Sequence, residues 1–232
     1  MLRLYEIAKK ARSGEEGAQN ENLLTGIFVW VNERYPQFLL KIFEQSHYFG
    51  RIDEFNKLVS QFEKDDLQLD SIDSSLDGSA EFGRLDAVFK GKIFTLGLEN
   101  KVVPIAKLKP NDLHNQIERY CQAMEKTELS SEWLILVITP DSESDAKKEL
   151  GPFSKTFSDK VCWISWQKVW DISKDIIESP NISKDKKLVL GELKGGLELA
   201  NLKLIKPKPN RCNTDKNPKN YRNKKPCSLI NS

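Results

Sequence analysis

GRLDAVFKGKIFTLGLENKV, residues 83–102, contains two β-rich runs separated by a turn signal. The first run extends over Phe82–Phe89 and the second over Lys92–Val103, with Lys90-Gly91 between them. Valine, isoleucine, phenylalanine and threonine are enriched in strands, and glycine is a residue that tight turns often need. This stretch therefore predicts a β-hairpin.

Helical and strand patterns alternate along the chain on both sides of this hairpin. Asn20 is the predicted N-cap of the first helix, and the polar stretch Asp65–Gly78 is predicted to be a loop. Continuous apolar strands that alternate with helices indicate a sheet covered on both faces. The predicted fold is an α/β fold, a three-layer α/β/α sandwich with a mixed central sheet. Its further strands are Trp133–Thr139 and Val161–Ser165. Its helices are Glu21–Arg34, Gln37–Gln45, Asp53–Lys64, one capped by Asn111, one in the acidic segment after Pro140, and Trp166–Ile177.

Charged side chains of opposite sign gather on the second strand of the hairpin. Strand alternation puts Glu99 and Lys101 on one face and Asn100 on the other. Asp86, on the partner strand, adds a second carboxylate. Two carboxylates suit a hard divalent cation such as Mg²⁺, which polarises a phosphoryl oxygen and lowers the pKa of a bound water. A lysine beside them can orient that water and stabilise negative charge, so the pattern indicates metal-assisted hydrolysis of a phosphodiester.

The spacing of these residues requires an irregular hairpin. With a two-residue turn, Asp86 would sit opposite Thr95, four residues and roughly 13 Å from Glu99 along the strand. The two carboxylates can then meet only through a wider loop, a strong twist or a bulge. Gly97 is the predicted place of a local distortion, because a glycine inside a strand often marks one.

Asp86, followed after twelve residues by Glu99-Asn100-Lys101, resembles the D-x(n)-E-x-K signature of the PD-(D/E)XK nuclease superfamily, which has the restriction-endonuclease-like fold. Leu85 stands where the family name has proline. The resemblance covers roughly residues 20–177. NENLLTGIF (20–28) is similar to the N-terminal helix of that superfamily, NQIERYCQAM (115–124) to the helix after the hairpin, and WLILVITP (133–140) and VCWISWQKVW (161–170) to later elements.

The resemblance implies a role for each of five residues. Asp86 and Glu99 would bind the metal, Lys101 would orient the attacking water, Glu21 would support the metal or a water, and Gln116 would line the site. Two of these assignments have alternatives. Glu21 can be explained as a first-turn acid that the helix dipole favours, and Gln116 as a solvated helix residue.

Composition excludes several other classes of protein. Among 232 residues there are only 4 Cys and 2 His, without a C-x-x-C pair, which argues against a zinc site and against a disulfide framework. A single bridge between Cys212 and Cys227 stays open. The longest apolar run, Trp133–Ile138, is too short to span a membrane, and the N-terminal residues lack an export signal, so a cytoplasmic location is expected. P-loop, dinucleotide and G-x-S-x-G motifs are also missing from the sequence.

Charge divides the chain into two parts. Residues 203–225 contain nine basic residues and one acidic residue, whereas residues 1–202 contain 27 basic and 33 acidic residues. We therefore predict a nuclease-like domain over residues 1–202 and a basic, disordered tail over residues 203–232. Such a tail is attracted to phosphates without regard to sequence, although a solubilising extension would have the same composition. Trp163, Trp166 and Trp170 are interpreted as core residues rather than as base-stacking ones.

The resemblance implies a Mg²⁺-dependent nuclease, with Mn²⁺ as a substitute ion. DNA is the expected substrate in preference to RNA, endonuclease cutting is the expected mode, and restriction, phage defence or repair is the expected setting. A homodimer or a larger assembly is consistent with this. The alternative is a non-catalytic nucleic-acid-binding or assembly module that retains the nuclease fold, and a third option is a nuclease active only within a larger assembly. Asp86, Glu99 and Lys101 argue against the non-catalytic module, because binding alone needs no such convergence of charges.

Overall fold

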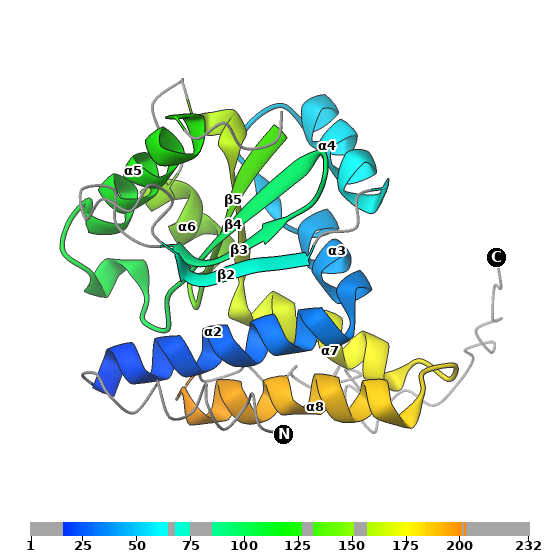
Figure 1. The fold of residues 1–232 in the computed structure, drawn as a ribbon. Coiled ribbons are helices and arrows are strands. Elements are labelled where there is room, and N and C mark those ends of the chain that lie inside the picture. The colour runs from blue at the N-terminus through cyan, green and yellow to red at the C-terminus, as the bar shows by residue number, and fades with distance from the viewer. Residues whose placement is uncertain are drawn as a thin grey trace, which may run out of the picture.

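A six-stranded sheet in the order β1-β6-β5-β4-β3-β2 forms the centre of the molecule (Figure 1). The computed structural model describes residues 16–64, 68–74, 85–126, 132–150, 157–200 and 202. β4 pairs with β5 and β5 pairs with β6 in parallel, and the other neighbours are antiparallel, so the predicted mixed sheet is confirmed. The strands are β1 (His47–Tyr48), β2 (Gln68–Ser74), β3 (Leu85–Lys90), β4 (Phe94–Asn100), β5 (Glu132–Thr139) and β6 (Val161–Ser165).

Helices cover both faces of the sheet, as predicted. They are α2 (Glu16–Arg34), α3 (Pro36–Glu44), α4 (Ile52–Lys64), α5 (Asp112–Lys126), α6 (Glu143–Leu150), α7 (Trp166–Glu178) and α8 (Lys184–Leu199), with 3-10 turns η1 (Ile105–Lys107) and η2 (Ser158–Lys160). Side chains of α2, α3, α4, α7 and α8 pack into one apolar cluster, and those of α5 and α6 into a second. Strand β5 contributes Leu134, Leu136 and Ile138 to the first cluster and Ile135 and Val137 to the second. The α/β/α sandwich follows from this alternation.

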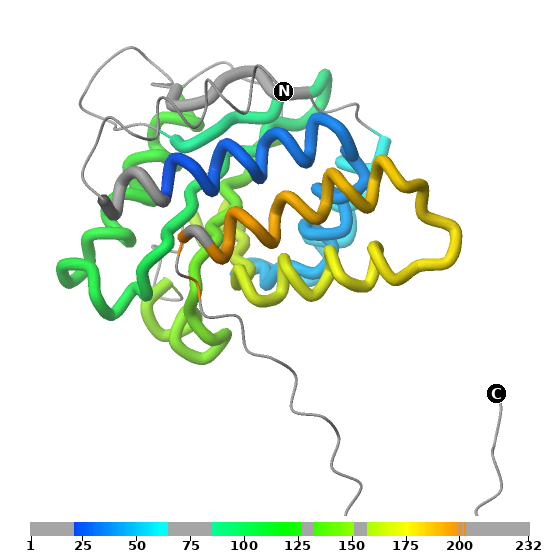
Figure 2. Tube along the Cα trace, turned by 90° about the horizontal axis from the view of Figure 1, so that it is seen from below, coloured from blue at the N-terminus to red at the C-terminus, as the bar shows by residue number. Residues whose placement is uncertain are grey.

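One apolar face holds α2 against the rest of the protein. The buried side chains of this face, three or four residues apart, are Leu24, Ile27, Phe28 and Val31. The ring of Phe28 meets that of Trp166, at the start of α7, with a centroid distance of 5.8 Å. Helix α8 lies beside α2 (Figure 2), and Gly196 permits a close approach, because a Cβ there would lie 2.7 Å from Cδ1 of Ile27. This packing fixes the position of every side chain that α2 presents to the sheet.

Several elements differ from the prediction, which also lacks the short strand β1. Helix α2 begins at Glu16, so Asn20 lies inside the helix and the predicted N-cap is wrong. Strand β2 lies in the polar stretch predicted as a loop over Asp65–Gly78, because pairing with β3 outweighs its polar composition. Helix α8 is missing from the predicted elements, since the glycines and charged residues of its sequence obscure the helical pattern.

The hairpin between β3 and β4 has a wider loop than the pair Lys90-Gly91 predicts. Lys90 pairs with Thr95, and the Gly91 N–H donates to the Phe94 carbonyl at 2.8 Å. Thr95 is therefore the partner of Lys90 and not of Asp86. This register moves Asp86 toward the far end of β4, so a wider loop is one device that brings the two carboxylates together.

Gly97 does not distort β4. It pairs with Val88 on one side and with Ile135 on the other in regular register, so the distortion predicted at this glycine is wrong. A Cβ at Gly97 would lie 2.9 Å from Cδ1 of Leu85. The glycine therefore makes room for a buried leucine beside Asp86.

The tryptophans at the end of the sheet belong to the core, and that prediction is confirmed. Trp163 and Trp166 are 4% and 1% exposed, and Trp170 packs partly buried against the same core as Trp166. The Nε1 atom of Trp166 donates to the carbonyl of Lys101 at 3.0 Å. Trp166 thus fixes the backbone that follows β4.

Other sequence-based predictions concern cysteines, the membrane and the tail. Cys121 and Cys162 are buried and free. The pair Cys212 and Cys227 and the basic tail lie outside the described residues. Within the ranges that the structure describes, no helix has the length and apolar character needed to cross a membrane.

Candidate metal centre

The candidate site lies at the end of β4, where the two hairpin strands stop pairing. The pairing runs as far as Ala87 with Leu98, and continuing it by one residue places Asp86 beside Glu99. Leu85 and Ala87 pack into opposite apolar clusters, although strict alternation would put them on one face. β3 therefore departs from regular alternation at Asp86, at the point where its carboxylate approaches β4.

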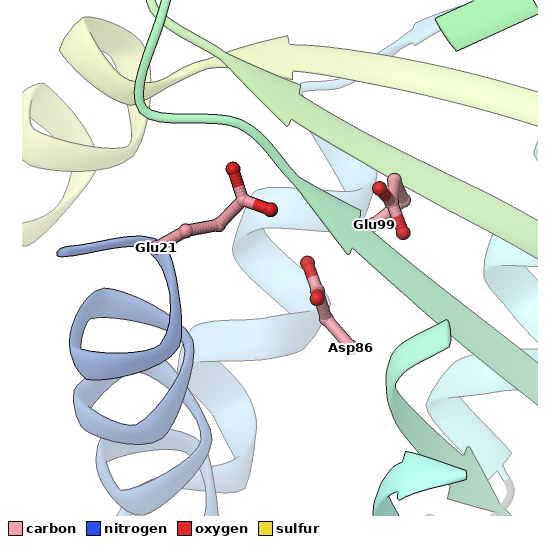
Figure 3. A group of neighbouring side chains, drawn as sticks. All are labelled: Glu21, Asp86 and Glu99. Atoms are coloured by element: carbon pink, nitrogen blue, oxygen red, sulfur yellow. The ribbon is translucent and has the colours of Figure 1, made fainter. Parts of the chain in front are cut away.

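Three carboxyl groups from three different elements converge at this point. Glu21 comes from α2, Asp86 from β3 and Glu99 from β4, and each offers an oxygen within 4.8 Å of the other two (Figure 3). Oxygen ligands at 2.0–2.6 Å from one cation lie no more than about 5 Å apart. The three acidic residues predicted from the sequence as ligands are thus neighbours at the spacing that one metal ion requires.

Lys101 lies among these acids. Its Nζ atom is 2.6 Å from Oε1 of Glu99 and 2.9 Å from Oε1 of Glu21, and its side chain is 13% exposed. Burial by itself lowers the pKa of Lys101, but the charges of Glu99, Glu21 and Asp86 outweigh it and raise that pKa above its ordinary value. The ammonium group is therefore protonated at neutral pH and acts as a donor and a positive charge, not as a base.

Glu99 is the most deeply buried of the three acids. Its side chain is 1% exposed, and the donors that face its carboxylate are the ammonium group of Lys101 and the hydroxyl of Tyr120. Burial raises the pKa of Glu99 to about 7, against the opposing effect of Lys101. A buried carboxylate has room for about four hydrogen bonds or ligand contacts, and the lone pairs that Lys101 and Tyr120 leave open favour a proton or a cation. Glu99 therefore fits a metal ligand.

Charge balance favours a cation in the same place. Burial and the charges of Glu99 and Glu21 raise the pKa of Asp86 well above its ordinary value. Three ionised carboxylates and one ammonium group would leave a net charge of −2 in a largely buried cluster. An all-oxygen donor set of this kind suits hard cations such as Mg²⁺ better than zinc or copper.

Gln116 reaches the cluster through a tyrosine. Its Nε2 atom donates to the hydroxyl of Tyr120 at 2.6 Å, and burial together with the charge of Glu99 raises the pKa of Tyr120. Tyr120 is 1% exposed, and the sequence does not identify it as a site residue, because its position fits the apolar stripe of the helix equally well. The signal that could have identified it is the spacing of four residues from Gln116, which puts both side chains on one helix face.

The helix dipole does not explain why an acid is present at Glu21. Helix α2 begins at Glu16, so Glu21 is its sixth residue, whereas the favourable effect of the helix dipole is confined to the first turn. The alternative interpretation of Glu21 is therefore wrong. The contact with Lys101 explains why an acid is present at this position.

Residues 33–190 match the model of one protein family, described as the PD-(D/E)XK nuclease superfamily. The match covers about two thirds of the chain and includes Asp86, Glu99, Lys101 and Gln116, while Glu21 precedes it. No curated protein and no solved structure matches the chain significantly.

Proposed function

Because the chain belongs to the PD-(D/E)XK nuclease superfamily, we propose that it is a Mg²⁺-dependent nuclease that cleaves phosphodiester bonds in DNA as an endonuclease. The observation that carries this proposal is the buried acidic cluster with Lys101 inside it. A merely structural ion pair would need one carboxylate for one lysine. Here two carboxylates contact one ammonium group, and a third carboxylate, that of Asp86, has an oxygen within 4.8 Å of both.

We assign Asp86 and Glu99 as the metal ligands of the sheet, with Glu21 as the ligand or water acceptor from α2. When bound there, Mg²⁺ or Mn²⁺ would supply Lewis-acid activation of the phosphate and of a water. Lys101 stays protonated, so it donates hydrogen bonds to the attacking water or to the phosphate and stabilises the negative charge of the transition state. Gln116 supports this arrangement by holding the hydroxyl of Tyr120 next to Glu99.

The remaining features of the proposal concern the substrate and the assembly. Residues 1–202 would form the nuclease domain, and the nine cations of residues 203–225 would attract the phosphate backbone. We infer DNA rather than RNA as the polymer, a setting in restriction, phage defence or repair, and a homodimer as the form that cuts both strands. Sedimentation of the full chain with and without DNA tests the dimer.

The test of the proposed activity is cleavage of supercoiled plasmid, linear DNA and RNA in Mg²⁺, in Mn²⁺ or in EDTA. Wild type is compared with Glu99→Ala and Lys101→Ala, each of which we expect to reduce cleavage at least 100-fold, since each removes a group that stabilises transition-state charge. Nicking of closed circular plasmid would identify endonuclease cutting. Cleavage in EDTA, or full activity of either variant, would contradict the proposal.

Glu63→Ala and Lys64→Ala are matched controls for these variants. Both residues are exposed at the end of α4, a helix whose Phe62 packs on Phe94 at the start of β4. The acidic cluster lies at the other end of that strand, so we expect both controls to cut like wild type. If wild type binds DNA in a salt-dependent manner but never cuts it, the non-catalytic binding module becomes the better description of the isolated chain.

A further inference from the structure

Asn100, the residue between Glu99 and Lys101, holds the carboxylate of Asp86. Its side chain is completely buried, and its Nδ2 atom donates to Oδ2 of Asp86 at 2.9 Å. Its backbone N–H donates to the same oxygen at 2.7 Å. Two donors on one oxygen restrict the rotation of the carboxylate, and neither of them engages Oδ1 of Asp86.

Asn100 can donate to Asp86 from both its backbone N–H and its side chain, because the pairing of β3 with β4 ends beside it. The Lys101 N–H donates to the carbonyl of Ile138 on β5, so the N–H of Asn100 points to the opposite side, toward β3. β3 and β4 pair only as far as Ala87 and Leu98. The side chain of Asp86 thus accepts the hydrogen bond that a continuing backbone ladder would have taken.

The same amide group connects the sheet to α2. Nδ2 of Asn100 also donates to Oγ1 of Thr25, whose hydroxyl donates to the carbonyl of Glu21 at 3.0 Å. The backbone of Glu21 and the carboxylate of Asp86 are therefore linked by hydrogen bonds through Thr25 and Asn100, whereas Lys101 joins the side chain of Glu21 to that of Glu99. One buried amide thus connects the first half of α2 to the carboxylate on β3.

Stability alone does not account for an amide at this position. Oδ1 of Asn100 is buried and has no hydrogen-bond partner among the described residues. A buried amide that is half satisfied is less favourable than an apolar side chain of the same size. What the amide provides, and a leucine would not, is the pair of donor contacts to Asp86 and Thr25.

We propose that Asn100 is a positioning residue for the metal centre: it orients the carboxylate of Asp86 and connects it to the first half of α2. This inference rests on the proposed function, since it assumes that Asp86 binds the metal. Groups that orient metal ligands in this way typically change metal affinity by 10- to 100-fold when they are removed. A residue that only ends a strand would change the stability of the fold and leave the affinity of the folded protein for metal unaltered.

Asn32 offers a matched control. It is also a buried asparagine, its Oδ1 also has no partner among the described residues, and its Nδ2 donates to the carbonyl of Phe28 at 2.7 Å. It lies near the other end of α2, three turns from Glu21. Asn100→Leu and Asn32→Leu therefore make the same chemical change in two buried places, of which only one touches the acidic cluster.

The experiment measures Mn²⁺ binding to the full-length, metal-stripped protein by calorimetry, without nucleic acid. We expect Asn100→Leu to raise the Kd for Mn²⁺ at least about tenfold and Asn32→Leu to leave it within about twofold of wild type. In cleavage assays, Asn100→Leu should raise the Mn²⁺ concentration for half-maximal rate and recover most of the rate at saturation. Asn100→Ser, which removes the amide without adding bulk, serves as a second variant in case the leucine does not fold.

The outcomes separate this inference from the proposed function. If wild type binds Mn²⁺ and a folded Asn100 variant binds it equally well, the positioning role is wrong while the nuclease proposal stands. If wild type binds Mn²⁺ and the Asn100 variants bind it weakly, but no polymer is cut, the positioning role stands and the proposed activity is wrong. If wild type does not bind Mn²⁺ at all, both are wrong. A loss of affinity that persists in an Asp86→Asn background would also contradict the inference, because the effect should act through Asp86.

Discussion

At the scale of single residues, the protein buries charged side chains in its interior, where an ionised group is energetically unfavourable. Glu99 is almost completely buried, and the pKa of its carboxyl group is raised to about 7 although a lysine lies 2.6 Å away. Asp86 and Glu21 add further negative charge within 4.8 Å. Perturbed acids of this kind cluster at functional sites, where a bound cation or a substrate relieves their repulsion.

The raised pKa of Glu99 predicts how the stability of the metal-free protein depends on pH. The ordinary pKa of this carboxyl group is 4.5, so between pH 4.5 and 7 the folded state binds more protons than the unfolded state. The free energy of unfolding contributed by Glu99 therefore falls as pH rises through this window, by at most about 1.4 kcal/mol per pH unit.

Urea denaturation in EDTA at pH 5, 6, 7 and 8 checks this prediction. The difference in the free energy of unfolding between wild type and Glu99→Gln should shift in favour of the glutamine variant as pH rises, because glutamine does not titrate. A difference that is constant from pH 5 to pH 8 would mean that Glu99 titrates at its ordinary value.

At the scale of elements, α2 matters most, because it delivers Glu21 to a site that the sheet otherwise forms. Its position depends on one buried face, in which Phe28 is 0% exposed and contacts the rings of Phe38 and Trp166. Trp166 in turn donates to the backbone of Lys101. Packing under α2 and the geometry of the site are therefore coupled.

Phe28→Ala should lower the free energy of unfolding by about 3–5 kcal/mol, the usual cost of removing a buried phenylalanine. Urea denaturation followed by circular dichroism measures this change. Leu188→Ala is the control, since Leu188 on α8 is 68% exposed, and we expect a change within about 0.5 kcal/mol there. Equal effects of the two variants would contradict the packing described for α2.

At the scale of the whole molecule, the distribution of charge suggests two separate contributions to nucleic-acid binding. The acidic cluster repels phosphate unless a cation is bound, whereas residues 203–225 carry nine of the 36 lysines and arginines of the chain. The body, with its net charge of −6, would gain little attraction for DNA from long-range electrostatics. If the chain binds DNA as proposed, we expect residues 203–225 to contribute the salt-dependent part of the affinity.

Replacing the nine basic residues of the tail by glutamine or serine in the full-length chain should weaken DNA binding at low salt. Each tail cation that neutralises a phosphate adds roughly −0.9 to the slope of log K against log salt, so the slope should become less negative by several units. Titration of a labelled duplex at several salt concentrations measures it. The cleavage rate at saturating DNA should stay close to wild type, and an unchanged slope would assign the attraction to the folded body instead.

The hairpin of β3 and β4 shows which features local sequence predicts and which depend on strand pairing. Strand type, mixed sheet and sandwich followed from local patterns, since alternation and apolar runs depend only on neighbouring residues. The length of the loop between β3 and β4 could not be predicted from Lys90-Gly91 alone, because the register in which the two whole strands pair sets that length. The same holds for β2, whose polar sequence becomes a strand only beside β3.

Local patterns in the sequence are enough to identify the residue types available for the site and the elements that carry them: two carboxylates and a lysine on a hairpin, an acid on a helix and a glutamine on another. It requires the packed structure to show that Glu21, Asp86 and Glu99 lie within 4.8 Å of one another, that Tyr120 lies next to Glu99, and that Asn100 holds Asp86. These contacts join positions far apart in the chain or on opposite faces of a strand. Their distances arise from burial of α2, register of β3 and β4 and the end of strand pairing, which are properties of the packed molecule and not of any segment alone.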